Sequence, residues 1–462
     1  MMPKIFEPRV YQSLIRDFII EHHRCAIWAD MGLGKTAATL SALDLLWLAG
    51  SNYWPALVIA PLRVARGTWP REQQKWADFG TMKVSAITGD VNNRLHALRV
   101  KADVYTINFE NAQWMFDTLQ GRWPFKIVIV DEATRLKGFR LRNGTKRSTL
   151  LSEIALRTPR WVELTGTPAP NGLKDLWGQL WFLDQGQRLG ATYGDFQQRW
   201  FKTDPYTDAV SPEWYALEQI PDAVRDICLT VRARDYFDVK EPIVRQVEID
   251  LPPKARELYR ELEREMYAQI DALGVHVDAV NAAGLTAKCL QVASGAVIAK
   301  DGDDERLVHE VHEEKLDALE SIFEECNGHP LLIGHWWKAD RARILKRFPF
   351  VQEIKTQKDE DRWNEGRIPG AVAHYASLGH GLNLQDGGHR LVRYSRWWDA
   401  ELDDQLSERI GPVRQIQSGH DRPVYHYNIV ARDTADMDVE YRHESKAEVQ
   451  NILRDRTRRR AA

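Results

Sequence analysis

The 462-residue sequence contains only four cysteines, and they lie far apart along the chain. None of them forms a C-x-x-C pair, so the sequence supports neither a zinc site nor a disulfide framework. The four positions are Cys25, Cys228, Cys289 and Cys326. We expect small buried thiols in a protein of the reducing cytoplasm.

Long apolar runs and an excess of positive charge are also missing. No run of about 18 apolar residues is available for a membrane-spanning helix, and the first residues lack the apolar core of a signal peptide. The formal net charge is −3, so the overall charge does not favour nucleic acid. A locally basic channel stays compatible with this total, because steering depends on how charges are distributed.

The sequence does contain many short apolar runs, with helical patterns between them. The runs in the first part are 25–28, 56–60, 104–107, 127–130 and 161–164; those in the second part are 330–334, 371–375, 389–394 and 424–430. Buried strands that alternate with helices predict parallel sheets with helices on both faces. The fold class is therefore α/β.

This pattern predicts two α/β domains in tandem, separated by other segments. We expect a first domain over 1–170, a helical and aromatic insertion over 171–240, a linker with a helical segment over 241–305, and a second domain over 306–462. The stretch from Pro242 to Pro253 is predicted to be an extended linker, and 275–284 a loose connection. Ligands of such sheets bind at the carboxyl ends of the strands.

One glycine-containing segment, Ala29–Thr36, follows a predicted strand and opens a predicted helix. Its order of strand, glycine loop, Lys-Thr and helix is typical of a nucleotide phosphate cradle, although Ala29 stands where glycine is usual. Backbone amides near Gly32 and Gly34 would face phosphate oxygens. Lys35 would reach the β- and γ-phosphates, and the Thr36 hydroxyl would bind Mg²⁺.

A second candidate, Asp131-Glu-Ala-Thr134, directly follows a predicted buried strand. Asp131 is placed to hold Mg²⁺, directly or through water, and Glu132 to orient the attacking water. Phosphoryl transfer depends mainly on such positioning and charge neutralisation. The histidines lack the spacing of a metal site, so we expect no metal besides Mg²⁺.

These two segments resemble the Swi/Snf-type ATPases, which are helicase-like motors of the DExx-box superfamily two. The resemblance extends from about residue 8 to about residue 439 and points to a compact bacterial or phage form. It implies two RecA-like domains with a helical insertion, and ATP and Mg²⁺ as cofactors.

The resemblance also assigns residues outside the two segments. It implies nucleotide contacts for Gln12, Gly381 and Gln405. It implies contacts with the DNA backbone for Arg63, Thr106, Asn108, Thr165, Thr167 and Asn383, and it places Trp69 in a segment that touches nucleic acid.

Arg409 and Arg414 resemble the charge-sensing arginines of the second domain, which stabilise the transition state when two domains close on one nucleotide. Their spacing departs from the family pattern by two residues, with Pro412 between them. Arg409 fits the family pattern better than Arg414 does.

The function that the resemblance implies is an ATP-driven translocase on double-stranded DNA, with contacts that do not depend on base sequence. Two alternatives stay open. One is an RNA or single-strand helicase that separates strands, and the other is a nucleotide-gated DNA clamp or recruitment factor with little turnover. Glu132 and Arg409 count against the clamp, because a clamp needs neither.

Overall fold

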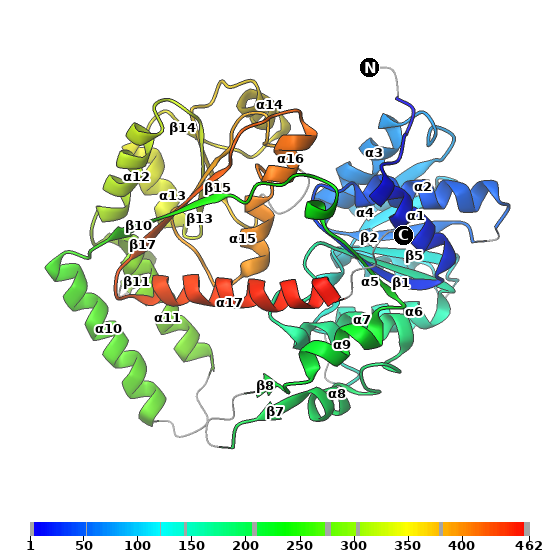
Figure 1. Ribbon diagram of the computed structural model, residues 1–462, viewed down its shortest axis with the longest axis horizontal. Helices are drawn as coiled ribbons and strands as arrows, with labels where there is room; N and C mark the ends of the chain where they lie inside the picture. Colours follow the sequence, from blue (N-terminus) through cyan, green and yellow to red (C-terminus); the bar gives the residue numbers. More distant parts are fainter. Residues whose placement is uncertain are drawn as a thin grey trace. The chain divides into compact units, whose positions relative to one another are not determined.

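The computed structural model describes residues 4–51, 53–120, 122–142, 146–205, 210–272, 279–301, 305–377 and 382–456 (Figure 1). The chain divides into two compact units. Unit 1 comprises Met1–Asp238 together with Lys446–Ala462, and unit 2 comprises Val239–Ser445. Each unit contains a parallel sheet covered by helices, so the α/β fold class predicted from the sequence is confirmed.

The described part of unit 1 forms a seven-stranded sheet in the order β3-β4-β2-β5-β6-β1-β9, and every neighbouring pair is parallel. The strands are β1 (Arg24–Ala29), β2 (Ala56–Ala60), β3 (Val84–Ile87), β4 (Val104–Asn108), β5 (Ile127–Asp131), β6 (Arg160–Thr165) and β9 (Cys228–Val231). The five runs predicted for this part are strands. The sequence pattern missed β3 and β9, which have only four residues each.

The helices around this sheet are α1 (Val10–Glu21), α2 (Lys35–Leu48), α3 (Trp69–Lys75), α4 (Val91–Arg99), α5 (Ala112–Thr118) and α6 (Lys146–Arg157). A second group follows β6: α7 (Leu176–Asp184), α8 (Tyr193–Trp200), the short hairpin of β7 (Phe201–Thr203) and β8 (Val210–Pro212), and α9 (Ala216–Val224). Residues on both faces of β2, β4 and β5 are buried, as expected of a sheet covered on both sides.

Unit 2 has a six-stranded parallel sheet in the order β10-β17-β16-β13-β15-β14. Its strands are β10 (Ile243–Ile249), β13 (Leu331–His335), β14 (Val351–Glu353), β15 (Gly370–His374), β16 (Arg390–Arg393) and β17 (Tyr425–Ala431). The predicted linker over 242–253 is wrong in part, because β10 pairs with β17 along its full length at the edge of the sheet (Figure 1). Only tertiary pairing makes this mostly exposed segment a strand.

The helices of unit 2 are α10 (Pro253–Ala272), α11 (Ala279–Ser294), α12 (Glu314–Glu325), α13 (Lys338–Arg347), α14 (Gln357–Asn364), α15 (Ala400–Ser407) and α16 (Pro412–Gln417). β11 (Ala296–Asp301) and β12 (Glu305–Glu310) form an antiparallel pair. The loose connection expected over 275–284 is helical from Ala279 onward, and residues 273–278 lie outside the described residues.

The last helix, α17 (Ala435–Arg456), contributes residues to both units. Its first part belongs to unit 2, whereas the segment from Lys446 onward belongs to unit 1. We expected all of 306–462 in the second domain, and a separate insertion over 171–240. The structure differs because Leu453 is fully buried in the unit 1 core and β9 pairs with β1 in the unit 1 sheet.

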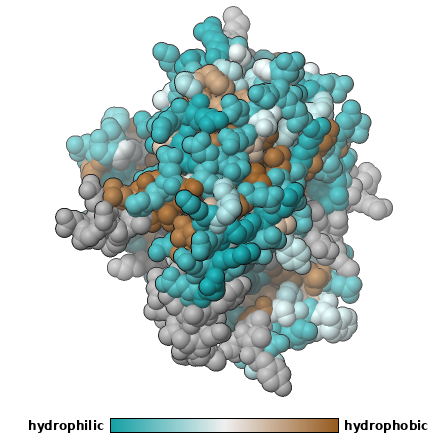
Figure 2. Space-filling view, turned by 90° about the vertical axis from the view of Figure 1, so that its left-hand side faces the viewer, coloured by the Kyte–Doolittle hydropathy of each residue, from teal (hydrophilic) through white to brown (hydrophobic). Residues whose placement is uncertain are grey.

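The surface of the protein is mostly polar, as its composition predicts. The face shown in Figure 2 is mostly hydrophilic, with patches of apolar residues, as is usual for a folded protein. No helix among the described residues is both long and apolar enough to cross a bilayer.

All four cysteines are free and buried, as predicted, and burial raises the pKa of Cys25 to about 12.

Gly178 allows α7 to pack closely against the segment that follows β5. A Cβ at this position would lie 2.5 Å from the carbonyl oxygen of Lys137 and 2.7 Å from that of Leu136. Backbone atoms cannot move aside as flexible side chains do, so we expect Gly178→Ala to lower the free energy of unfolding by about 1–3 kcal/mol. Urea unfolding of the full chain measures this value. Gly138→Ala is the control, since no atom lies within 4 Å of its added Cβ; equal effects would contradict the packing argument.

Candidate active site

The glycine loop between β1 and α2 has the backbone of a phosphate cradle. Gly32 and Gly34 have φ angles of 82° and 72°, in the left-handed region that favours glycine. Gly34 is the N-cap of α2, and a Cβ there would lie 2.4 Å from Nε2 of Gln12. The Gln12 side chain also donates a hydrogen bond to the Leu33 carbonyl oxygen at 3.4 Å. The structure therefore places the Gln12 side chain against the loop.

Lys35 is the first residue of α2, and its ammonium group lies on the loop. Its Nζ atom donates to the carbonyl oxygens of Ala29 at 2.7 Å and Asp30 at 3.3 Å. Thr36 is half-buried in the same first turn. Positive charge is therefore concentrated at a helix N-terminus, which favours a bound anion.

Asp131 ends β5, and its side chain is 8% exposed. The Trp69 indole donates a hydrogen bond from Nε1 to Oδ2 of Asp131 at 2.9 Å. Burial raises the pKa of Asp131, while this hydrogen bond, the Lys35 charge and the amide of Glu132 act in the opposite direction. β6 alone separates β5 from β1 in the parallel sheet, so the loop after β1 and the end of β5 lie at the same edge.

Trp69 has a different place from the one that the resemblance implied. It is fully buried at the start of α3, so it is not exposed to nucleic acid in this structure. Its indole instead holds a carboxylate oxygen of the candidate magnesium ligand. No sequence pattern pointed to this bond, because it joins residues 62 positions apart.

Glu132 follows Asp131 with an unusual backbone. Its φ and ψ angles are 61° and 58°, which is the left-handed region. Few residues other than glycine adopt this conformation, and those that do are concentrated at functional sites. The turn ends β5 abruptly and leads into the 3-10 helix Ala133–Leu136.

The segment after β6 also reaches the glycine loop. A Cβ on Gly166 would lie 3.1 Å from Cγ of Met31 and 3.6 Å from the Ala29 carbonyl oxygen. On either side of Gly166, Thr165 and Thr167 are buried, and the Thr167 amide donates to Oγ1 of Thr165 at 3.1 Å. The ends of β5, β6 and β1 thus lie side by side at this edge of the sheet.

The residues expected to contact DNA differ in accessibility. Arg63, ahead of the π-helix Val64–Thr68, is exposed. Thr106 is fully buried and donates from Oγ1 to the Ala65 carbonyl oxygen at 2.6 Å. Asn108 is also buried, and its Nδ2 donates to Glu110 at 2.8 Å. Direct contact with a phosphate requires exposure, which Thr106, Asn108, Thr165 and Thr167 lack in this structure.

The donor set at this site suits a magnesium ion bound with a triphosphate. A hydroxyl on Thr36 and a carboxylate on Asp131 are hard oxygen donors of the kind that Mg²⁺ prefers. A divalent cation would also offset the cost of burying the Asp131 charge. Among the described residues, no group of three or more histidine, cysteine or acidic side chains could hold a metal ion.

Unit 2 gathers its two candidate arginines on one carbonyl group. Nη1 of Arg409 and Nη1 of Arg414 each donate to the Leu382 carbonyl oxygen at 3.4 Å. Arg414 also donates to Oδ1 of Asn383 at 2.6 Å. Arg409 lies in the turn between α15 and α16, and Arg414 lies in α16, which Pro412 opens. The structure therefore brings Arg409, Arg414 and Asn383 together within unit 2.

Buried charges fix the helix that precedes Arg409. The Arg393 guanidinium donates to both carboxylate oxygens of Asp403 at 3.0 Å. Burial would raise the pKa of Asp403, but Arg393 and Arg396 bring it well below its usual range. Gln405, on the same helix, is buried, and its Oε1 has no hydrogen-bond partner among the described residues. Gly381 lies outside the described residues.

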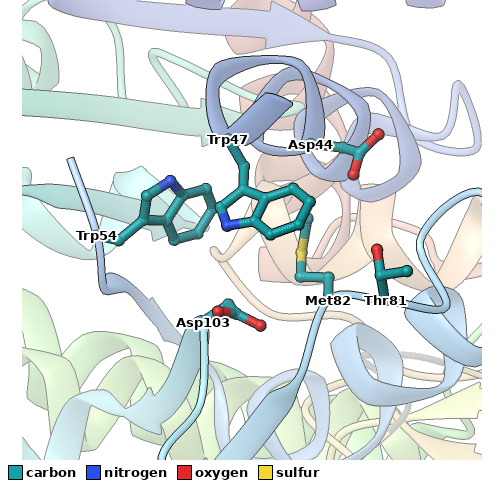
Figure 3. Close-up of a pocket in the computed structure, with 6 residues that line it drawn as sticks. All are labelled: Asp44, Trp47, Trp54, Thr81, Met82 and Asp103. Atoms are coloured by element: carbon teal, nitrogen blue, oxygen red, sulfur yellow. The ribbon is translucent and has the colours of Figure 1, made fainter. Parts of the chain in front are cut away.

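A narrow surface pocket of unit 1 lies apart from these residues. The indoles of Trp47 and Trp54 and the carboxylate of Asp103 border it (Figure 3), together with Asp44, Thr81 and Met82. None of the predicted site residues lines it. Burial, with the Asp78 charge, raises the pKa of Asp44.

The bond between Trp69 and Asp131 is open to direct test. We expect Trp69→Phe to lower the free energy of unfolding by about 1–3 kcal/mol, because a buried carboxylate oxygen loses its donor. Trp76→Phe is the matched control, since its indole donates to Glu72 at 2.8 Å in a half-buried position. Urea unfolding compares the two variants. A cost for Trp69→Phe no larger than that for Trp76→Phe would contradict this role.

Comparison with known proteins agrees with this geometry. Residues 17–290, more than half of the chain, match the family model of the SNF2-related domain. Protein p41 of Acyrthosiphon pisum secondary endosymbiont phage 1 is 47% identical over 99% of this chain and 100% of its own length. The human DNA annealing helicase and endonuclease ZRANB3 is 25% identical over 89% of this chain but only 37% of its own length.

Among solved structures, the Sulfolobus solfataricus SWI2/SNF2 ATPase core in complex with double-stranded DNA covers 98% of this chain and 94% of its own, with 20% identity and a TM-score of 0.44. The family assignment does not depend on this likeness. The match of residues 17–290 to the family model shows the family. The chain belongs to the SNF2-related family of helicase-like ATPases.

Proposed function

We propose that this protein is an ATP-driven motor that moves along double-stranded DNA. The observation that carries the proposal is the grouping of Lys35, Asp131 and the glycine loop at one edge of the unit 1 sheet. Relatives in the same family include a protein named as a DNA annealing helicase. Since p41 is a phage protein, we place the activity in a bacterial or infected-host cytoplasm.

Lys35 would exchange its present partners for the phosphates of ATP. Its bonds to the carbonyl oxygens of Ala29 and Asp30 keep the ammonium group beside the loop until a triphosphate arrives. Thr36 and Asp131 would hold Mg²⁺, which neutralises phosphate charge when bound. Glu132 would orient the attacking water, and Gln12 would contact the base beside the loop.

The arginines of unit 2 would supply positive charge during hydrolysis. Arg409 and Arg414 already converge on the Leu382 carbonyl oxygen, so a single movement of unit 2 would carry both. Arginines used in this way stabilise the transition state only while two domains are closed on the nucleotide. Closure and opening would then follow the state of the nucleotide. Gln405 and Gly381 would contact the nucleotide, as the resemblance implies.

Exposed residues would grip the DNA backbone. Arg63 of unit 1 and Asn383 of unit 2 are exposed, whereas the buried Thr106, Thr165 and Thr167 would position the loops that carry the contacts. Binding through phosphates is largely independent of base sequence and weakens as salt rises.

Steady-state ATP hydrolysis tests the proposal. We expect the rate to rise with double-stranded DNA more than with single-stranded DNA, RNA or no polymer. Lys35→Ala should abolish the stimulated rate because the phosphates lose their cation, and Glu132→Gln should bind ATP without hydrolysing it. Preference for RNA or single strands would favour a strand-separating helicase, and equal rates under all four conditions would favour the clamp. Parent-level turnover by Lys35→Ala would refute the cradle.

The two arginines can be separated by substitution. Charge-sensing arginines contribute about 10³–10⁵-fold to the rate in other phosphoryl-transfer enzymes. We therefore expect Arg409→Ala to lower the hydrolysis rate by a factor of that order, and Arg414→Ala to lower it by a smaller factor. Nucleotide affinity should hardly change, because binding depends on unit 1. Arg367→Ala is the control, since that side chain is exposed beside Glu365. Turnover at the parent rate in Arg409→Ala would show that Arg409 is not a charge-sensing arginine.

A further inference from the structure

The C-terminal end of α17 lies against the ATP-site segments of unit 1. Leu453 is fully buried in the unit 1 core. Arg454, the next residue, forms an ion pair with the Asp30 carboxylate in the glycine loop. Two turns earlier, Nζ of Lys446 donates to Oδ1 of Asn171 at 3.1 Å. This part of α17 therefore contacts both the loop and the end of the segment after β6.

Asp30 connects the ion pair to Lys35. One oxygen of its carboxylate faces Arg454, and the other accepts a hydrogen bond from the Ala233 amide at 2.7 Å. Its own carbonyl oxygen accepts from Lys35 at 3.3 Å. The side chains of Arg454 and Asp30 are 13% and 27% exposed, so the pair is shielded better than an ordinary surface pair.

We propose that Arg454 is a positioning residue for nucleotide binding, acting through Asp30. The inference rests on the proposed use of ATP by the glycine loop and extends it to a residue of the C-terminal helix. Two physical effects of Arg454 would both raise the affinity for nucleotide. Arg454 fixes Asp30, and with it the loop backbone that must be ordered when a phosphate binds. Arg454 also compensates a carboxylate that would otherwise repel the triphosphate.

Nucleotide affinity of the full chain tests this role. The probe is a fluorescent, non-hydrolysable ATP analogue titrated in the presence of Mg²⁺, and ATP hydrolysis gives KM and kcat separately. We expect Arg454→Ala to raise Kd and KM about two- to fivefold, the upper part of the range for ion pairs near a protein surface, with kcat within about twofold. Arg454→Lys should restore most of the affinity, because it keeps the positive charge.

A second substitution separates positioning from general destabilisation. In the Asp30→Asn background the repelling charge is absent, so Arg454→Ala should have much less effect on Kd than in the parent. Such non-additivity is the signature of two coupled residues. Arg442→Ala is the matched control, because this arginine of α17 lies over the Trp398 ring. It should leave Kd unchanged.

The outcomes are distinct. An unchanged Kd in Arg454→Ala, or an equal loss in the parent and Asp30→Asn backgrounds, overturns the role of Arg454. A fall in melting temperature with the same Kd shows a structural contact only and also overturns it. If the parent chain binds no nucleotide, the proposed function itself fails, and the inference fails with it.

Discussion

A buried carboxylate is stable only when nearby donors or cations compensate its charge, and in unit 1 this requirement applies to Asp131. The Trp69 indole holds one oxygen, and the Lys35 ammonium acts from the glycine loop. The two partners come from the start of α3 and the start of α2, and Asp131 itself ends β5. The order of the central strands and the conformation of the loop therefore bring together the groups that compensate the Asp131 charge.

Close backbone packing around the loop imposes a second constraint. Gly34 leaves room for Gln12, and Gly166 brings the segment after β6 within contact distance of Met31. A larger residue at either position would push these segments apart, and in the proposed function the triphosphate contacts them together. The glycines of this site thus act by their missing side chains as much as by their backbone freedom.

Unit 2 uses buried charge in a different way. Arg393 and Asp403 anchor α15 in the core, and the chain beyond α15 turns so that Arg409 and Arg414 share the Leu382 carbonyl oxygen. Breaking such a buried pair costs far more than its net contribution to stability. The two arginines therefore follow a helix that a buried ion pair holds in the core of unit 2.

The sequence by itself determined the α/β class, the glycine loop and the residues at the strand ends, because these depend on local patterns: alternating strands and helices, and turns that need glycine. It missed β9 and β10, whose residues become strands only by pairing with β1 and β17. The bond from Trp69 to Asp131 and the return of Arg454 to Asp30 join residues 62 and 424 positions apart. Only the tertiary structure decided these contacts, because no local pattern encodes which distant side chain will meet a buried or partly buried charge.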